Sequence, residues 1–154
     1  MANEPNNTNK DGASQIMSNE TNGTNKARKL AGPDVVYPDL SYCIMEAVFE
    51  VHNRLGPGFS EEIYHRAMIA ELEVREIPFE TQRSITVLYR EKMIGTYYLD
   101  LVVDGKIIIE LKAVASLNDL FKQQLLSYLK ATGLRLGILI NFGSRRVEYI
   151  RIAN

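Results

Sequence analysis

The stretch from Leu99 to Lys112, LDLVVDGKIIIELK, places three charged side chains inside two otherwise apolar runs. Asp100 interrupts the first run, and Glu110 and Lys112 interrupt the second. Because Asp104-Gly105 between the runs is a strong hairpin signal, each run is predicted to be a β-strand. Glu110 and Lys112 lie two residues apart and therefore share one face of their strand. Two carboxylates and an ammonium on adjoining strands could hold Mg²⁺, which prefers carboxylate oxygens and keeps several waters.

A cation held in this way would lower the pKa of a bound water and stabilise charge on a phosphoryl oxygen. Lys112 would then position or deprotonate the attacking water, or offset developing negative charge. A purely structural interpretation is also open at this point. In that interpretation Asp100 and Glu110 face solvent on a half-exposed sheet, and Lys112 is their salt-bridge partner.

The register of the hairpin distinguishes the two interpretations. In a strict two-residue turn at Asp104-Gly105, Asp100 would point to the face opposite Glu110. A three-residue loop with a left-handed glycine, which pairs Val102 with Lys106, returns the two carboxylates to one face. A metal site therefore requires the odd loop or a bulge, and we predict one.

The rest of the chain alternates between helical and strand periodicity, which predicts an α/β fold. Gly56-Pro57-Gly58 ends a first helix, and Ser60 is the expected N-cap of a second. A crossover helix between a three-strand meander and a returning strand implies a mixed β-sheet flanked by helices, in the order ααβββαββ. The predicted elements are helices over 38–55 and from 61 to before 78, strands over 84–90, 94–103 and 106–112, a helix from 118 or 119 to 133, and strands over 134–141 and 147–152.

Composition separates a tail from one folded domain. Residues 1–36 are rich in Asn, Thr, Gly and Lys and nearly lack large apolar side chains, so we predict a disordered N-terminal tail and a single domain over 37–154. The net charge is −1, without the basic surface of a tight, sequence-indifferent DNA binder. No apolar run is long enough to span a membrane, and the single cysteine excludes an intramolecular disulfide, so we expect a cytoplasmic protein.

Two further motifs carry polar groups at helical spacing. Gly58 to Tyr64 contains G-x-x-E-x-x-Y, in which Glu61 and Tyr64 share one helix face. Gln124 and Tyr128 form Q-x-x-x-Y and lie four apart on the predicted third helix. Either motif alone is more often cap chemistry or a core tyrosine with a satisfied hydroxyl.

Taken with the hairpin, these motifs resemble the GxxExxY family of the PD-(D/E)XK nuclease superfamily, on the side that is similar to RecB-type nuclease domains. The resemblance covers residues 39–152, and it implies a restriction-endonuclease-like core. The segments that carry it are LGPGFSEEIY, YYLDLVVDGKIIIELKAV, QQLLSYL and GILINFGSRRVEYIRI.

The resemblance implies roles for the hairpin residues. Asp100 matches the first metal-binding carboxylate of the superfamily, and Glu110 and Lys112 match the second ligand and the catalytic lysine. Glu61 matches a helix glutamate that can reach the metal directly or through water, and it is included among the catalytic and metal-binding residues. The residue before Asp100 is Leu99 rather than proline, at a position that varies widely in the superfamily.

The resemblance also implies substrate contacts. Gln124 and Tyr128 match residues that contact the substrate backbone or support the active site, and Tyr64 is placed with them as a substrate-binding residue. A histidine near His52 can join the metal in RecB-like sites, although a helix-surface histidine is the commoner explanation. His65 has less support than His52.

The expected function is hydrolysis of DNA phosphodiester bonds by a nuclease that depends on Mg²⁺ or Mn²⁺. We expect nucleic acid, specifically DNA, as the partner and no membrane association. The alternative is a catalytically inactive nucleic-acid-binding or assembly module with the same fold, because fold resemblance does not establish activity. A domain that joins an oligomer through its long helices is a third possibility, on which the sequence is silent.

Overall fold

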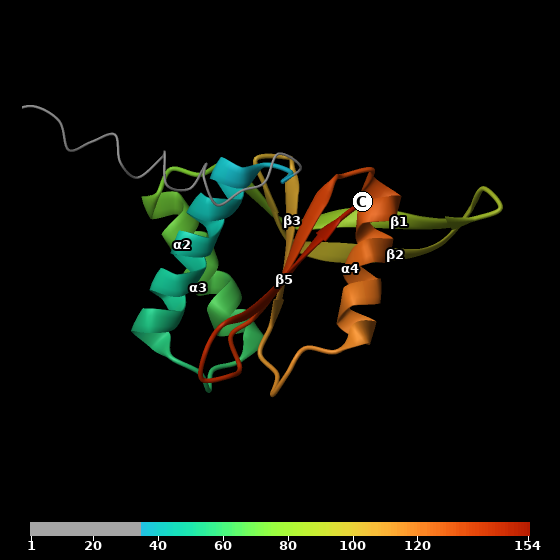
Figure 1. The fold of residues 1–154 in the computed structure, drawn as a ribbon. Helices are drawn as coiled ribbons and strands as arrows, with labels where there is room; N and C mark the ends of the chain where they lie inside the picture. The colour runs from blue at the N-terminus through green and yellow to red at the C-terminus, as the bar shows by residue number, and fades with distance from the viewer. Residues whose placement is uncertain (1–34) are drawn as a thin grey trace, which may run out of the picture.

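The computed structural model describes residues 35–154 of the chain (Figure 1). The order of its helices and strands confirms the predicted order ααβββαββ. The elements are α2 (Pro38–Leu55), α3 (Glu61–Val74), β1 (Phe79–Tyr89), β2 (Lys92–Val103), β3 (Ile107–Lys112), α4 (Asp119–Thr132), β4 (Leu136–Asn141) and β5 (Glu148–Ala153).

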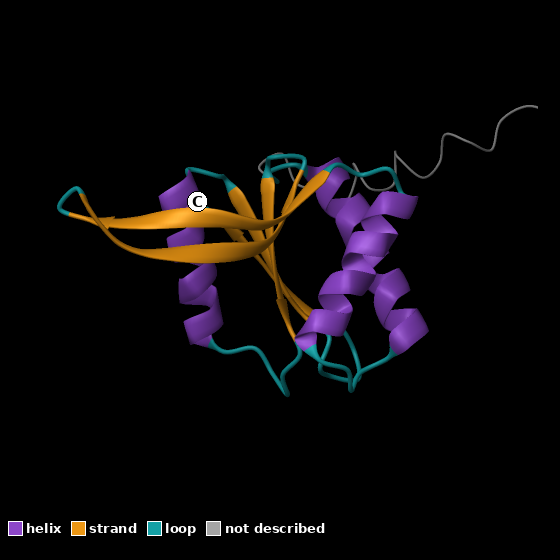
Figure 2. Cartoon of the chain, turned by 180° about the vertical axis from the view of Figure 1, so that it is seen from behind, coloured by secondary structure: helices purple, strands orange, loops and turns teal. Residues whose placement is uncertain are grey.

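The five strands form one mixed sheet in the spatial order β1-β2-β3-β4-β5. Only β3 and β4 pair in parallel, and α4 provides the crossover between them. The helices α2 and α3 lie on one side of the sheet and α4 lies on the other (Figures 1 and 2). The predicted mixed sheet flanked by helices is therefore confirmed.

The ends of the helices follow the signals in the sequence. α2 ends before Gly56, which has φ 67°, and Ser60 is the N-cap of α3. The side chain of Asn118 caps α4 by accepting a hydrogen bond from the Phe121 N–H at 3.1 Å. Gly133, with φ 71°, ends α4 in the left-handed conformation that glycine adopts without a steric cost.

The first strand differs most from its prediction. β1 begins at Phe79, five residues before the predicted Ser84, because the polar segment at its start pairs with the end of β2. The tip of the β1–β2 hairpin lies at Arg90-Glu91 rather than at Glu91-Lys92. Arg90 and Glu91 have φ 46° and 65°, the two positive values that a type I′ turn requires.

Two apolar clusters lie on the two sides of the sheet. The larger cluster lies between the sheet and the α2–α3 pair, and the smaller one lies between the sheet and α4. Both clusters include residues of β2, β3 and β4, so β3, β4 and the last part of β2 are buried on both faces.

β2 changes its orientation at Asp100. Leu99 packs in the cluster beneath α4, whereas Leu101, two residues later, packs in the cluster beneath α2 and α3. Residues two apart on a regular strand would share a face. On β1, Thr81 pairs with Leu101 and Arg83 pairs with Leu99, and Gln82 between them has a positive φ of 52°, so the neighbouring strand is irregular at the same point. Beyond the bend, β1 and β2 continue past α4 as an extended two-stranded arm (Figure 2).

The predicted tail over residues 1–36 falls almost entirely outside the described part of the chain. Val36 and Tyr37 pack against the larger apolar cluster at the start of the domain. Among residues 35–154, none of the helices has the length and apolarity needed to cross a membrane.

Candidate active site

The hairpin between β2 and β3 has the odd loop that a shared face requires. Val103 pairs with Ile107, which leaves the three-residue loop Asp104-Gly105-Lys106. The loop has the predicted length of three residues. The pair that closes it is Val103 with Ile107, whereas the predicted pair was Val102 with Lys106. Since the pairing continues to Leu101 and Ile109, Asp100 and Glu110 are the next residues in register. Asp104 and Gly105, with φ 51° and 62°, form the tight turn within the loop.

Asp100 and Glu110 are neighbours in a largely buried environment. The Asp100 carboxylate accepts a hydrogen bond from the Leu111 N–H at 2.9 Å. The Glu110 side chain is only 5% exposed, and its Oε1 has no hydrogen-bond partner within the described residues. The interpretation of Glu110 as a solvent-facing residue is therefore wrong.

The electrostatics of Glu110 reflect this burial. Loss of hydration is the largest cause, and together with the neighbouring Asp100 charge it raises the pKa of Glu110 to about 8. Lys112 opposes this rise, and Glu61 adds a smaller contribution that raises the pKa. Without a bound cation, the Glu110 carboxyl is therefore largely protonated at neutral pH.

Lys112 lies close to the carboxylates without pairing to one of them. Its Nζ lies over the Phe121 ring, 5.1 Å from the ring centroid, in a cation–π contact. Within residues 35–154, Lys112 forms no salt bridge, so the interpretation of Lys112 as a salt-bridge partner is also wrong. The ammonium is therefore held by a ring, near the acidic groups and available to them.

The G-x-x-E-x-x-Y motif sets the position of Glu61, the first residue of α3. Gly58 has φ 111°, which favours glycine at this point of the turn. The Tyr64 hydroxyl donates to the Gly56 carbonyl at 2.6 Å and accepts from the Phe59 N–H at 3.3 Å. Because Tyr64 is fully buried, its ring cannot touch a nucleic-acid backbone in this conformation. We therefore correct its assignment from substrate binding to fixing the turn that presents Glu61.

Glu61 belongs to the same electrostatic group as the hairpin residues. Although the residue as a whole is exposed, its carboxyl is partly withdrawn from water, and this desolvation raises the pKa of Glu61. Lys112 lowers this pKa and Asp100 raises it. His65, one helical turn later, has its Nε2 3.0 Å from the Asp100 carbonyl oxygen and 3.1 Å from Thr81 Oγ1. These contacts tie α3 to the bend of β2.

The Q-x-x-x-Y pair reaches the site from α4. The pKa of Tyr128 is raised to about 12, mainly by burial and then by the charge of Glu110, by Tyr97 and by Asp100, whereas a hydrogen bond with Gln124 opposes the rise. The Tyr128 hydroxyl thus lies near both carboxylates. The structure brings together the predicted residues Asp100, Glu110, Lys112, Glu61, Gln124 and Tyr128, and it does not bring Tyr64 to them.

Two residues that sequence reasoning missed hold the loop between the hairpin and α4. Asn141 is fully buried and exchanges two hydrogen bonds with the backbone of Val114, at 3.0 and 2.9 Å. Glu148 accepts hydrogen bonds from Asn141 Nδ2 at 3.2 Å and from the Leu117 N–H at 3.1 Å. An asparagine at the end of an apolar strand was the available signal, but its partner Val114 lies 27 residues away along the chain.

A divalent cation fits this site only as a weakly liganded ion. Within residues 35–154, no group of three or more His, Cys, Asp or Glu side chains is placed to hold a metal. Asp100 and the unpartnered oxygen of Glu110 offer two carboxylates, which suits Mg²⁺ or Mn²⁺ bound mainly through water and substrate oxygens. His52 lies elsewhere, with its Nε2 3.1 Å from the Ser144 carbonyl oxygen and its ring stacked on Phe142.

Comparison with known families agrees with this arrangement. The sequence profile described as the PD-(D/E)XK nuclease superfamily matches residues 38–152, which is nearly all of the described chain. The chain belongs to the PD-(D/E)XK nuclease superfamily. The sheet, the flanking helices and the hairpin that carries Asp100, Glu110 and Lys112 are thus those of a nuclease-like domain.

A solved structure has a similar fold. The crystal structure of the protein SSO0001 aligns with a TM-score of 0.50 and 23% sequence identity. The alignment covers 60% of this PD-(D/E)XK chain and 49% of the other chain, so the matched region spans about half the length of that protein. At this identity the likeness concerns the fold alone. The comparison with curated proteins gave no match.

Proposed function

We propose that this PD-(D/E)XK protein is a nuclease of the GxxExxY group that hydrolyses phosphodiester bonds of DNA with Mg²⁺ or Mn²⁺. Asp100 and Glu110 are the proposed metal ligands, and Glu61 reaches the ion through water, because these three carboxylates are not placed as one direct ligand group. Lys112 assists the attacking water, and Gln124 and Tyr128 contact the substrate backbone.

The observation that carries the proposal is the environment of Glu110. A carboxyl that is 5% exposed, lies beside a second carboxyl and has an unpartnered oxygen is unfavourable in an isolated protein. Its raised pKa expresses the same cost. Such an unfavourable arrangement indicates a functional site, because a bound cation would relieve the repulsion between Glu110 and Asp100.

The chain's own residues would contribute as follows. A bound cation supplies an acidified water and neutralises charge on a phosphoryl oxygen. Asp100 and Glu110 hold that charge at the end of the hairpin, and Lys112 hydrogen-bonds the water or the non-bridging oxygen. From α4, the Gln124 amide and the Tyr128 hydroxyl would donate hydrogen bonds to the substrate backbone. Tyr128 is suited to this role because its hydroxyl lies near both carboxylates.

The direct test is cleavage of labelled single- and double-stranded DNA in Mn²⁺ by the wild-type protein and two aspartate variants. Asp100→Asn should reduce the cleavage rate by about 10²-fold or more, because it removes one ligand charge. Asp104→Asn is the matched control, since Asp104 lies four residues away on the exposed turn and should leave the rate within about twofold. Equal rates for the two variants, or no cleavage of any substrate by the wild-type protein, would contradict the proposal.

The second candidate is an inactive nucleic-acid-binding or assembly module, and the small ligand set of the described residues favours it. Calorimetric titration with Mn²⁺ separates the two functions without measuring cleavage. A nuclease site should release close to one proton per cation at pH 7, because binding displaces the proton of Glu110. Glu110→Gln should abolish this release. DNA binding without heat or proton release on Mn²⁺ addition would favour the binding module.

A further inference from the structure

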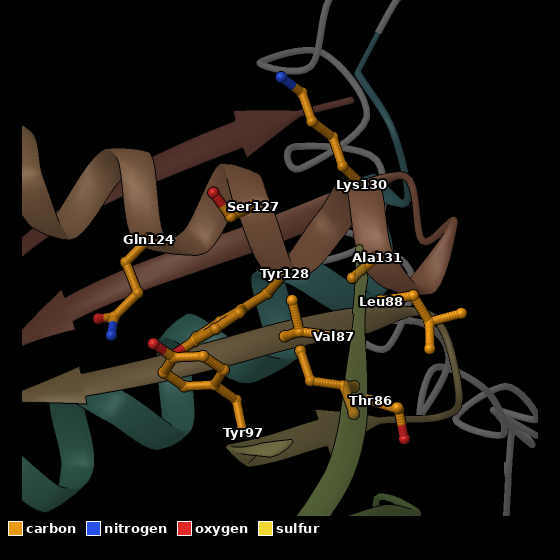
Figure 3. A pocket seen from close by; sticks show the side chains of 10 residues that line it. Thr86, Val87, Leu88, Tyr97, Gln124, Ser127, Tyr128, Lys130 and Ala131 are labelled. Atoms are coloured by element: carbon orange, nitrogen blue, oxygen red, sulfur yellow. The ribbon is translucent and has the colours of Figure 1, made fainter. Parts of the chain in front are cut away.

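A cavity lies near Asp100 and Glu110, here called the carboxylate cluster, on the same side of the sheet. It has a volume of about 750 Å³ and opens between α4 and the β1–β2 arm (Figure 3). This volume lies within the range of small-molecule pockets, and it exceeds what the chemistry at Asp100 and Glu110 needs. The lining residues are Ile85, Thr86, Val87, Leu88, Tyr97, Gln124, Ser127, Tyr128, Lys130 and Ala131.

We propose that this cavity receives an unpaired base of a single-stranded substrate, stacked on Tyr97, while the adjoining phosphate lies at the carboxylate cluster. The inference rests on the proposed nuclease function and deepens it by naming the substrate class. A base in a duplex would have to leave its pair and its stack to enter such a cavity, so the enzyme would favour single strands, frayed ends or flaps.

Tyr97 has the geometry of a stacking platform. Tyr97 is 50% exposed, although Leu99, two residues later on the same strand, is fully buried. One side of the ring meets Tyr128, with centroids 5.6 Å apart and planes inclined by 51°. Figure 3 shows the two rings side by side, with the Gln124 amide directed towards them. An exposed aromatic ring beside polar donors suits a nucleobase, which has an apolar face and hydrogen-bonding edges.

Tyr128 links the cavity to Asp100 and Glu110, which do not themselves line it. This residue lines the cavity and contacts Tyr97, and its hydroxyl is close enough to Glu110 and Asp100 for both charges to influence it. Gln124 also belongs to both places. A strand whose base lies against Tyr97 would therefore carry its backbone past the proposed ligands.

The charge of the cavity favours an anionic ligand over a cationic one, and its apolar lining favours a ligand with an apolar face such as a base. Lys130 is the only charged residue in the lining, and it has no ion-pair partner among residues 35–154. Figure 3 shows its ammonium at the rim, turned away from the two rings. A cation at the rim suits a phosphate of the neighbouring nucleotide, and an apolar interior suits its base.

The test compares Tyr97→Ala with its neighbour Tyr98→Ala. Tyr98 is 60% exposed and lies next on the same strand, but it does not line the cavity, so it controls for loss of an exposed tyrosine from the arm. Fluorescence anisotropy would follow a short labelled single strand and the corresponding blunt duplex, in EDTA and in Ca²⁺. A strand containing 2-aminopurine would report stacking through quenching of its fluorescence.

We expect Tyr97→Ala to weaken single-strand binding by about 5- to 100-fold and to remove the 2-aminopurine quenching, because stacking on one ring is lost. Tyr97→Phe should restore both, and Tyr98→Ala should change binding by less than about twofold.

Equal effects of the two alanine variants, or binding of the duplex as tightly as the single strand, would overturn the base pocket while leaving the nuclease proposal intact. Light scattering that shows a wild-type dimer and a monomeric Tyr97→Ala variant would also overturn it, because a second copy would then cover the cavity. A wild-type protein that neither binds nor cleaves DNA would contradict the proposed function itself.

Discussion

The two faces of the β-sheet are covered in different ways. Two helices, α2 with 18 residues and α3 with 14, cover one face, and α4 with 14 residues covers the other alone. Beneath the helix pair the buried cluster consists of apolar side chains, together with Tyr64, whose hydroxyl is satisfied by the turn before α3. Beneath α4 the packing is incomplete, and the cavity, the Tyr128 hydroxyl and the Glu110 carboxyl all lie on that side or at its edge.

This difference indicates a division of roles between the faces. A close-packed apolar interface contributes to stability in proportion to the area it removes from water. The α4 face gives up part of that contribution, because it keeps a cavity and an unpartnered carboxyl oxygen. We expect substitutions under α2 and α3 to change stability and substitutions near α4 to change activity and pH dependence.

The largest effect on stability is expected from Ile138→Ala. Ile138 is fully buried beneath α2 and α3, and truncation would remove three carbon atoms from a packed cluster. Urea denaturation should show a loss of about 3 kcal/mol in the free energy of unfolding, with little change in the activity of the folded protein. Leu88→Ala is the control on the other face, since Leu88 lines the cavity and is 61% exposed, and it should change stability by less than about 0.5 kcal/mol. Equal losses for the two variants would remove the distinction between the faces.

The pH dependence of stability should depend on Glu110. Because its folded pKa is about 8 and lies above the ordinary value of 4.5, the folded state binds more protons than the unfolded state between these pH values. The contribution of Glu110 to stability is therefore fully present below about pH 4.5 and is lost as the pH rises through 8. Glu110→Gln should be more stable than the wild type by about 2 kcal/mol at pH 9 in EDTA, with little difference at pH 5.

The measurement is the urea midpoint at several pH values, with Glu73→Gln as the control because Glu73 is exposed on α3. Saturating Mn²⁺ should stabilise the wild type at high pH and leave the Glu110→Gln curve almost unchanged. A wild-type curve parallel to that of Glu110→Gln would mean that Glu110 is not buried in solution.

Local signals predicted much of the fold. The ends of α2 and α4 followed from glycines and an N-cap, and the odd loop followed from the requirement that Asp100 and Glu110 share a face. These features depend on neighbours in the sequence or on one hairpin. The early start of β1 was missed because residues 79–83 are mostly polar and become a strand only by pairing with β2.

The features of the site that sequence reasoning missed depend on distant contacts. The burial of Tyr64 results from stacking on Phe142, with centroids 4.6 Å apart, across 78 residues of sequence. The cavity beside Tyr97 exists because β2 bends at Asp100, and no local pattern marks a strand that changes its face. Residue types at functional spacing can thus indicate chemistry, whereas the surroundings of those residues require the fold.

The smallest effect that still tests the comparison is expected at Gly143, in the loop between β4 and β5. A Cβ at this position would clash with the backbone nitrogen and oxygen of Val114, in the loop between β3 and α4. Since backbone atoms cannot turn aside as a flexible side chain can, Gly143→Ala should displace this loop and cost about 1 kcal/mol of stability. Gly95→Ala is the matched control, because a Cβ at Gly95 would meet nothing within 4 Å.

The displaced loop leads from Lys112 to the helix that carries Gln124 and Tyr128. Gly143→Ala should therefore also lower the cleavage rate, by about 10-fold, although Gly143 itself touches none of the proposed catalytic residues. Single-turnover cleavage and urea denaturation of both glycine variants would measure the two effects separately. A Gly143→Ala protein that lost stability but kept its full rate would show that the α4 side of the site is positioned independently of this loop, and the role given to Asn141 and Glu148 in holding the loop for catalysis would then be wrong.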